Sequence, residues 1–510
     1  MGLTRRRALA TGSAALAGLL LSGIASGQST DSADDEALRT LGESVTAFGL
    51  DLHREVVAEA PEDNAMVSPY SASIALAMTW AGARSETASQ MAEALRYPYE
   101  RDRLHRTYGV LDERIDPPDS RNSTPTPTEE GSDDGESFSL ETANALWGQA
   151  GFPFSESYLD LLSEHYGAGL READFGESPE AARERINAWV ADQTAGTIED
   201  LLPPDAVGPS TRLVLTNAVY FSASWLHTFG GREATEPEPF TSIDGTTSEV
   251  PTMRHLNPVE LPYAEVDGTE VVSLPYEGET VDMVVLLPPA GEFESVEADL
   301  DVATLRSYFD ALEPRRGSVA MPRFEYDTKA SLERALSAMG MERAFSADAD
   351  FSGMVAPDAD RALAISDVIQ QTHVSVDEQG TEASAATSVV IWESANPDAF
   401  EMRVDRPFLY AIRHRATNTA LFLGRVVSLE GDGVSEGPPA VGDADAAPTD
   451  PDDDGRYEDL NGNGEVDYAD VVEYFDHMDE SSMTDHVDAY DYNGNGDLDY
   501  ADLVDLFGQV

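Results

Sequence analysis

Residues 376–391 form a run of small and polar side chains that constrains the fold more than any other part of the chain. After Gly380 the run contains mainly alanine, serine and threonine, and it ends in the apolar residues 389–391. Small side chains that alternate with polar ones suit a strand that slides between two others, because bulky inward groups would block it. Gly380 supplies the backbone freedom of a hinge. The run therefore predicts a segment that can insert into a β-sheet.

Strand alternation assigns the two faces of this segment. Thr381, Ala383, Ala385 and Thr387 point one way, whereas Glu382 points the other way, toward solvent. A charge at Thr381, or a proline in the run, would obstruct insertion, and neither occurs. The inward face is therefore compatible with burial in a sheet.

Charge and cysteine content exclude several classes of function. Acidic residues outnumber basic ones 96 to 32, for a formal net charge of −64. This balance argues against binding to nucleic-acid phosphates. It indicates adaptation to high salt, as in halophilic archaeal proteins, with a specific cationic partner as the alternative. The chain has no cysteine, which excludes disulfides, a thiol nucleophile and thiolate metal ligands.

The N-terminus has the pattern of an export signal. Arginines at 5–7 precede an apolar stretch of small residues that reaches about Ser26. We expect a signal peptide at 1–27 that resembles the twin-arginine type, followed by a short disordered acidic arm at 28–36. A permanent membrane span is the alternative, but glycine and serine interrupt the stretch. The mature protein is expected to be secreted, with no membrane span after cleavage.

Apolar patterns along the chain indicate a mixture of helices and strands. Helical periodicity is expected at 38–56, 71–80 and 183–194, and buried strands at 212–221, 281–287 and 421–427. No βαβ rhythm repeats, so the sequence predicts an α+β fold.

Two polar segments divide the chain. Residues 116–136 form an expected exposed insertion that carries a glycosylation sequon at Asn122. Residues 431–456 form an expected acidic linker before a compact module at 457–510. We therefore predict a main domain at 37–430 and a small C-terminal module.

Five motifs in the main domain resemble, in their order, those of the serpin family. They are Asn64–Ser71 with Ala75–Met78 and Gly82–Ala83, Thr216–Phe221 with Trp225, Met321–Phe324 with Leu332–Phe345 and Asp350–Met354, Asp405–Tyr410, and Leu421–Val427. The resemblance implies helices around a large central sheet and an exposed reactive-centre loop. It places Ser68 and Ser71 beneath the opening sheet, and Asn217 and Trp225 where insertion begins. Alternatively, the two serines cap a helix or lie at the edge of the core, and Trp225 has only a packing role in the core.

The same resemblance implies suicide inhibition of a serine protease by a monomer. Glu378, Gly380, Thr381, Ala383 and Ala385 would form the hinge. The scissile bond, counted forward from Glu378, joins Ser394 to Ala395, whereas counting back from Pro407 places Asn396 before the bond. We expect a subtilisin-like or chymotrypsin-like target. The alternative is a non-inhibitory protein whose loop is only a cleavable bait.

The sequence does not indicate an enzyme. A Gly-x-Ser-x-Gly nucleophile motif is absent, and no histidine has a recognisable catalytic context. His373 and His414, which flank strand-like segments, are expected to be structural.

The C-terminal module contains two similar acidic segments with the spacing of EF-hand-type calcium loops. Oxygen-bearing side chains recur at loop positions 1, 3, 5, 9 and 12, with glycine at 6 and a backbone carbonyl ligand expected at 7. The expected ligand residues for two calcium ions are Asp459, Asn461, Asn463, Glu465, Asp467, Asp470, Asp491, Asn493, Asn495, Asp497, Asp499 and Asp502. Plain acidic surface is the alternative.

This pair of loops, each followed by a helix, resembles a dockerin. The resemblance implies a small all-α module that binds a cohesin-bearing partner through Tyr468, Ala469, Tyr500 and Ala501. The near-symmetry of the two halves would permit binding in two orientations. We therefore expect a calcium-dependent tether for the main domain.

Overall fold

In the computed structural model the chain forms two compact units, Met1–Leu429 and Glu430–Val510. The structure describes residues 13–115, 139–142, 144–166, 170–194, 196–204, 206–231, 234–357, 363–366, 368–381, 399–429, 441–442, 448–449, 456–462, 466, 468–478, 483, 487–490, 492, 498 and 500–509. Within these residues, no helix combines the length and the hydropathy needed to cross a membrane.

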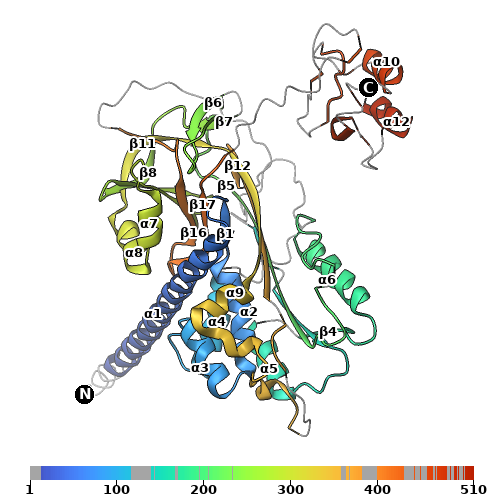
Figure 1. Ribbon diagram of the computed structural model, residues 1–510. Helices are drawn as coiled ribbons and strands as arrows, with labels where there is room; N and C mark the ends of the chain where they lie inside the picture. Colours follow the sequence, from blue (N-terminus) through green and yellow to red (C-terminus); the bar gives the residue numbers. More distant parts are fainter. Residues whose placement is uncertain are drawn as a thin grey trace, which may run out of the picture. The chain divides into compact units, whose positions relative to one another are not determined.

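A ten-stranded sheet forms one layer of the first unit (Figure 1). Its order is β1-β17-β16-β10-β9-β8-β11-β7-β6, and β15 pairs with β11. The strands are β1 (Ala65–Val67), β6 (Glu236–Thr241), β7 (Thr247–Arg254), β8 (Val259–Val266), β9 (Thr269–Pro275), β10 (Val281–Leu287), β11 (Glu313–Pro322), β15 (Phe400–Arg403), β16 (Phe408–His414) and β17 (Thr419–Val426).

A seven-stranded sheet forms the second layer. Its order is β12-β13-β14-β5-β3-β4, and β2 pairs with β5. The strands are β2 (Ser139–Thr142), β3 (Ala145–Gln149), β4 (Arg171–Ala173), β5 (Leu213–Ser224), β12 (Phe324–Ser331), β13 (Val368–Val376) and β14 (Gly380–Thr381). Over most of their shared length β13 and β5 pair directly and run parallel, and β14 lies between them at one end only.

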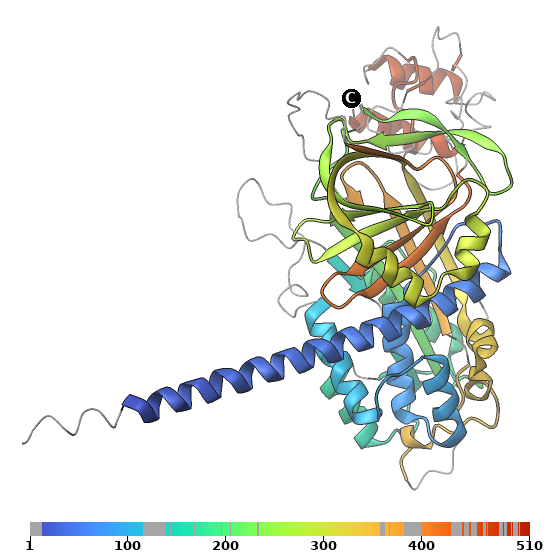
Figure 2. The same ribbon diagram turned by 90° about the vertical axis from the view of Figure 1, so that its left-hand side faces the viewer.

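Helices gather mainly at one end of the two sheets and along their outer faces (Figures 1 and 2). They are α1 (Ser13–Glu59), α2 (Pro69–Gly82), α3 (Ser85–Ala94), α4 (Arg101–Ile115), α5 (Glu156–Tyr166), α6 (Pro179–Gln193), α7 (Phe293–Asp299), α8 (Val302–Ala311) and α9 (Leu332–Leu336). Every residue of α2 is buried, and this helix contacts both β5 and β17. It therefore lies in the core between the two sheets.

The alternation of β5 explains how one strand serves two cores. Leu213 and Leu215 belong to the main core, whereas Val214 and Ala218 belong to a second core formed with α6. Side chains along a strand alternate between faces, so a continuous apolar run marks a strand covered on both sides. β5 is therefore a central strand.

The expected elements of the main domain are present, with one difference at the N-terminus. The helices expected at 38–56, 71–80 and 183–194 lie within or largely overlap α1, α2 and α6, and the strands expected at 212–221, 281–287 and 421–427 correspond to β5, β10 and β17. The prediction of a disordered arm at 28–36 is wrong, because α1 continues through these residues. No proline occurs between residues 13 and 59 to interrupt the helical hydrogen bonds.

The second unit has its own small core around two helices. These are α10 (Tyr468–His477) and α12 (Tyr500–Gln509), and a short 3-10 turn lies at Val487–Ala489. The core contains Val441, Leu460, Val471, Tyr474, Met483, Tyr490, Tyr492 and Leu506. The Tyr492 hydroxyl donates a hydrogen bond to the main-chain oxygen of Tyr457 at 2.7 Å, which joins the segment before α10 to the segment before α12.

Candidate functional site

The hinge of the small-residue segment already lies inside the seven-stranded sheet. Gly380 and Thr381 pair antiparallel with Ser224 and Ala223 of β5, and Thr381 also pairs with Val376 of β13. Thr381 is only 1% exposed. The chain therefore enters the sheet between β13 and β5, and residues 382–398, including Ala383, Ala385, Ser394 and Ala395, lie outside the described residues.

Close backbone packing explains the glycine of the hinge. A Cβ atom on Gly380 would lie 2.0 Å from the carbonyl oxygen of Ala223. The turn before it is fixed by Asp377, whose Oδ1 accepts hydrogen bonds from the amides of Gln379 at 2.8 Å and Gly380 at 3.0 Å. Only a residue without a side chain fits this approach to β5.

Two stacked aromatic rings hold the hinge from the core side. The rings of Trp225 and Tyr276 stack with centroids 4.5 Å apart and planes 11° apart. Trp225 donates from its backbone amide to the oxygen of Gln379 at 2.7 Å and from Nε1 to the oxygen of Asp377 at 3.0 Å. The hydroxyls of Tyr276 and Thr381 share a hydrogen bond of 2.8 Å. Burial raises the pKa of Tyr276 well above its usual range, so this hydroxyl stays protonated.

Glu378 anchors the strand end before the hinge. Its side chain is 4% exposed, and its carboxylate accepts a hydrogen bond from the Thr235 hydroxyl. The Arg323 guanidinium lies 3.9 Å from the other carboxylate oxygen. A buried carboxylate requires such partners. Sequence reasoning placed Glu378 in the hinge but missed Tyr276, Thr235 and Arg323, because these come from distant elements.

A buried polar cluster crosses the junction between α2 and the strands that flank the hinge. Asn217 of β5 donates to the Ser71 hydroxyl at 2.8 Å and to Asn144 Oδ1 at 2.7 Å. Gln370 of β13, paired directly with Asn217, donates to its Oδ1 at 2.5 Å and to the main-chain oxygen of Ser68 at 3.1 Å. These bonds satisfy polar groups that would otherwise be buried without partners.

Ser68 also caps α2. Its hydroxyl accepts from the Ser71 amide at 3.3 Å and donates to the oxygen of Leu421 at 2.8 Å. Pro69 follows at the first helical position, where its missing N–H has no consequence. Ser68 therefore caps α2, one of the roles considered from the sequence, and it contacts β13 through Gln370. Asn144 and Gln370 carried no sequence signal.

The two histidines considered for catalysis sit in structural surroundings. His373 Nδ1 lies 2.9 Å from Asp327, across the β12–β13 pair. His414 Nδ1 lies 2.8 Å from the hydroxyl of Thr417, and burial lowers the pKa of His414 to about 4. Among the described contacts of these two histidines, none is to a serine hydroxyl.

Part of the first calcium-type loop is described in the second unit. Asp470 Oδ1 accepts hydrogen bonds from the amide of Asn461 at 3.2 Å and from its side chain at 2.7 Å. Asp459 accepts from the Thr449 hydroxyl at 2.6 Å. Asp459, Asp470 and Asp502 are fully buried, and their oxygen donors suit a hard cation. The described part of the chain contains no group of three acidic or histidine side chains placed to hold a metal ion.

The remaining residues predicted for the loops and the sequon cannot be placed. Asn463, Glu465, Asp467, Asp491, Asn493, Asn495, Asp497 and Asp499 lie outside the described residues, as does Asn122.

Large apolar side chains lie exposed on both helices of the second unit. They are Tyr468, Val472 and Phe475 on α10 and Tyr500, Val504 and Phe507 on α12, which we call the paired apolar face. Tyr468 contacts Phe507 with ring centroids 6.2 Å apart, and Phe475 contacts Tyr500 at 6.1 Å. The start of each helix therefore meets the end of the other, as in a two-fold arrangement. Sequence reasoning named Tyr468, Ala469, Tyr500 and Ala501 and missed the other four, which follow one and two turns later.

Comparison with known proteins covers the first unit. Residues 43–429 match the family described as Serpin (serine protease inhibitor). An uncharacterized serpin-like protein of Thermococcus kodakarensis is 36% identical over 388 residues, covering 76% of this chain and 85% of that protein. The leukocyte elastase inhibitor of Bos taurus is 35% identical over 401 residues, covering 77% of this chain and 100% of that protein.

Solved structures agree with this match. The native thermophilic serpin tengpin has a TM-score of 0.65 and 28% identity, with coverage of 76% of this chain and 94% of that one. The ordered motifs, the hinge between β13 and β5 and these relatives lead to one conclusion: the chain belongs to the serpin (serine protease inhibitor) family, which is not a family of enzymes.

Proposed function

We propose that this serpin traps a serine protease by inserting its cleaved loop between β13 and β5. The observation that carries the proposal is the strand register. Thr381 lies opposite Val376 on one side and Ala223 on the other, and the direct β13–β5 pairs, such as Gln370 with Asn217, keep the same offset. A strand that continues from β14 would therefore insert between two strands that are already in register for it.

The same register predicts where the loop would go after cleavage. Extended from Thr381, Ala385 would face Val219 and Thr372, and Thr387 would face Asn217 and Gln370. The inserted strand would replace the single ladder of hydrogen bonds between β13 and β5 with two ladders, one to each neighbour. The small inward residues would fit beneath α2, where the polar cluster now closes the sheet.

The trapping chemistry uses the protease's own machinery. The protease serine oxygen attacks the carbonyl carbon of Ser394, the bond to the Ala395 nitrogen breaks, and that nitrogen leaves as a protonated amine. The resulting ester joins Ser394 to the protease. Insertion then displaces the protease and distorts its catalytic geometry before water can hydrolyse the ester. We propose a subtilisin-like or chymotrypsin-like target.

Protease incubation distinguishes an inhibitor from a cleavable bait. In multimolar salt, the inhibitor forms a complex that survives denaturing electrophoresis and releases a peptide that begins at Ala395. Thr381→Arg places a charge on the inward face and should convert the inhibitor into a substrate. Glu382→Arg is the matched control, because strand alternation predicts an outward side chain at this position after insertion, and it should retain trapping. Clean cleavage by an active protease would instead support the bait function.

We further propose that the second unit is a dockerin-type module that binds two calcium ions and a cohesin-bearing partner. Its support is the duplicated loop spacing, the three buried aspartates and the paired apolar face. When bound, calcium would neutralise the acidic loops and fix the helices that follow them. The two-fold arrangement of the face would allow a partner to bind in either of two orientations.

Calcium titration of the full chain tests this module. We expect two bound ions by calorimetry, and one after Asp470→Ala or Asp502→Ala. Chelation should abolish binding to a purified cohesin module and leave protease trapping intact. Val472→Asp with Val504→Asp should abolish cohesin binding while both calcium sites remain. The absence of calcium binding would refute the module without affecting the inhibitor proposal.

We also propose export and a high-salt habitat. The support is the arginine-rich, apolar N-terminus and the net charge of −64. Mature protein recovered from the culture medium should begin near Gln28, and replacing Arg5 and Arg6 with lysine should retain the precursor in the cell. Recovery of uncleaved chain from the medium would contradict a signal at 1–27.

A further inference from the structure

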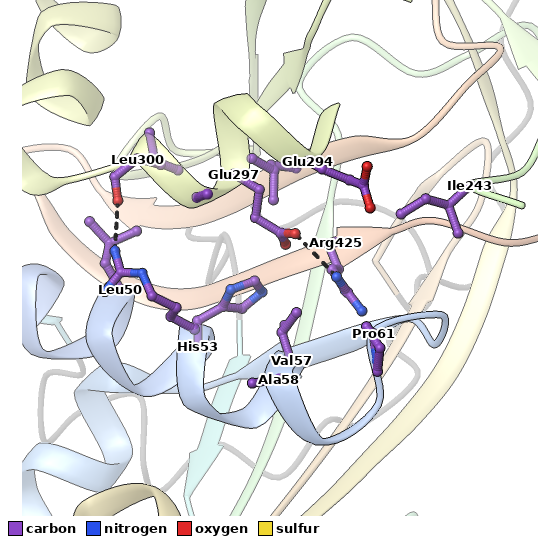
Figure 3. A pocket seen from close by; sticks show the side chains of 13 residues that line it. Leu50, His53, Val57, Ala58, Pro61, Ile243, Glu294, Glu297, Leu300 and Arg425 are labelled. Carbon is purple, nitrogen blue, oxygen red and sulfur yellow. Dashed lines mark hydrogen bonds and ion pairs between the residues drawn. The ribbon is translucent and has the colours of Figure 1, made fainter. Parts of the chain in front are cut away.

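A pocket of about 250 Å³ lies between α1, α7 and the strands β16 and β17 (Figure 3). Its walls are mainly apolar and include Leu50, Val57, Ile243, Leu300 and Leu409. None of its lining residues belongs to the hinge or to the polar cluster under α2. The pocket is therefore separate from the site described above.

A buried arginine forms part of the pocket lining. Arg425 is 1% exposed and donates to the main-chain oxygens of Ala60 at 2.9 Å and Asp63 at 2.9 Å. It also donates to one carboxylate oxygen of Glu297 at 3.1 Å. This ion pair balances the interior charge, and Arg54 and Glu294 at the rim add one charge of each sign. The pocket therefore has no net charge to offer an ionic ligand.

Two buried polar atoms in the pocket have no hydrogen-bond partner. They are Nε2 of His53 and the second carboxylate oxygen, Oε1, of Glu297. Figure 3 shows both side chains facing the space between α1 and α7. Burial, with a smaller effect from Arg425, lowers the pKa of His53 to about 3, so its ring is neutral near pH 7. Buried polar atoms are normally paired, which indicates a missing partner here.

We propose that this pocket binds a small neutral molecule with an apolar body and one hydroxyl group. A hydroxyl is both donor and acceptor, so it can donate to Glu297 Oε1 and accept from the Nε2–H of His53. The apolar walls would cover the rest of the molecule. Since a cavity of roughly 150 Å³ accommodates benzene, this pocket has room for two fused rings.

Binding of 2-naphthol to the full chain tests the proposal. Naphthalene has the same body without the hydroxyl, and 2-naphthoate carries a charge. We expect one bound 2-naphthol per chain by calorimetry, with affinity about ten-fold higher than that of either comparator. No saturable binding, or equal affinity for naphthalene, would overturn the proposal, because water alone would then satisfy the two polar atoms.

Three variants locate the site. His53→Phe keeps a ring but removes Nε2, so the hydroxyl keeps only its bond to Glu297 and the preference for 2-naphthol over naphthalene should fall well below about ten-fold. Ala298→Trp fills the pocket from an exposed position on α7 and should abolish binding. Ala303→Trp, exposed on α8 and outside the lining, is the matched control and should bind normally. Unchanged binding in Ala298→Trp would place the ligand elsewhere, whether or not His53→Phe folds.

Discussion

At the scale of single residues, the hinge depends on a glycine with no space for a side chain. A Cβ on Gly380 would meet the backbone of Ala223, which cannot move without β5. Gly380→Ala should therefore destabilise the fold by about 1–3 kcal/mol in urea unfolding. Gly208→Ala is the control, because no atom lies within 4 Å of its added Cβ, and it should cause no loss. Equal stability of both variants would contradict the described path of the hinge.

The hydrogen bond between Tyr276 and Thr381 can be measured by a double-mutant cycle. Tyr276→Phe keeps the stacking on Trp225, and Thr381→Val keeps the shape of the side chain. We expect a coupling of about 1 kcal/mol in unfolding free energy. A cycle of Tyr276→Phe with Ser375→Ala should be additive, because no hydrogen bond joins these two residues in the described structure. Additivity in both cycles would contradict the hydrogen bond between Tyr276 and Thr381.

The residues of the hinge differ in how far the sequence could identify them. Gly380 and Thr381 stand in a local run of small residues, and alternation alone assigns their faces. Tyr276 lies 105 positions from Thr381, and Thr235 lies 143 positions from Glu378. Such contacts depend on the register of whole strands, which no local pattern records.

At the scale of elements, α2, β5 and β13 are joined by the polar cluster that closes the sheet. Gln370→Ala removes the donor to Ser68 and Asn217, and also the acceptor of the Ser68 amide. We expect a loss of about 1–3 kcal/mol in urea unfolding, because buried polar groups lose their partners. Gln371→Ala, on the opposite face of β13, should cost less, since its side-chain oxygen has no partner in the described structure. Equal losses would mean that the cluster does not hold β13.

Elements with continuous apolar runs could be predicted, whereas their arrangement could not. β10 lies at the bounds expected from the sequence, because a run of six apolar residues, interrupted only by Asp282, has few alternatives to a buried strand. Polar residues at 28–36 predict a break before the main domain, but α1 continues through them because no proline there stops the helix. The position of β14 between two parallel neighbours follows from pairing, which the sequence does not show.

At the scale of the whole molecule, buried histidines link stability to pH. Burial lowers the pKa of His105 to about 3, with smaller effects from Arg101 and His165, and in the folded state its Nδ1 lies 2.6 Å from the Tyr166 hydroxyl. Above about pH 6.5 the ring is neutral in both states, so its contribution is constant. As the pH falls from there toward 3, the unfolded state binds the extra proton and stability is lost.

Urea unfolding as a function of pH measures this effect. We expect His105→Gln to make the slope between about pH 6 and pH 4 shallower by roughly 1.4 kcal/mol per pH unit. Carboxylates add their own slope mainly below about pH 5, and they are unchanged in the variant. An unchanged slope would mean that His105 is not neutral and buried.

The net charge of −64 should make stability depend on salt. Raising sodium chloride from about 0.1 M to 1 M shortens the Debye length from about 10 Å to about 3 Å. Self-repulsion of the folded state then falls, so the melting temperature should rise. Lower stability at high salt would contradict adaptation to that environment.

Loop insertion is the central claim, and protease trapping tests it most directly. The full chain would be incubated with subtilisin and chymotrypsin in multimolar salt and analysed by denaturing electrophoresis and mass spectrometry. The account predicts a covalent complex through Ser394, within about two positions, that Glu382→Arg forms and Thr381→Arg does not. Complete cleavage of the loop with full protease activity, and no complex with either protease, would contradict it.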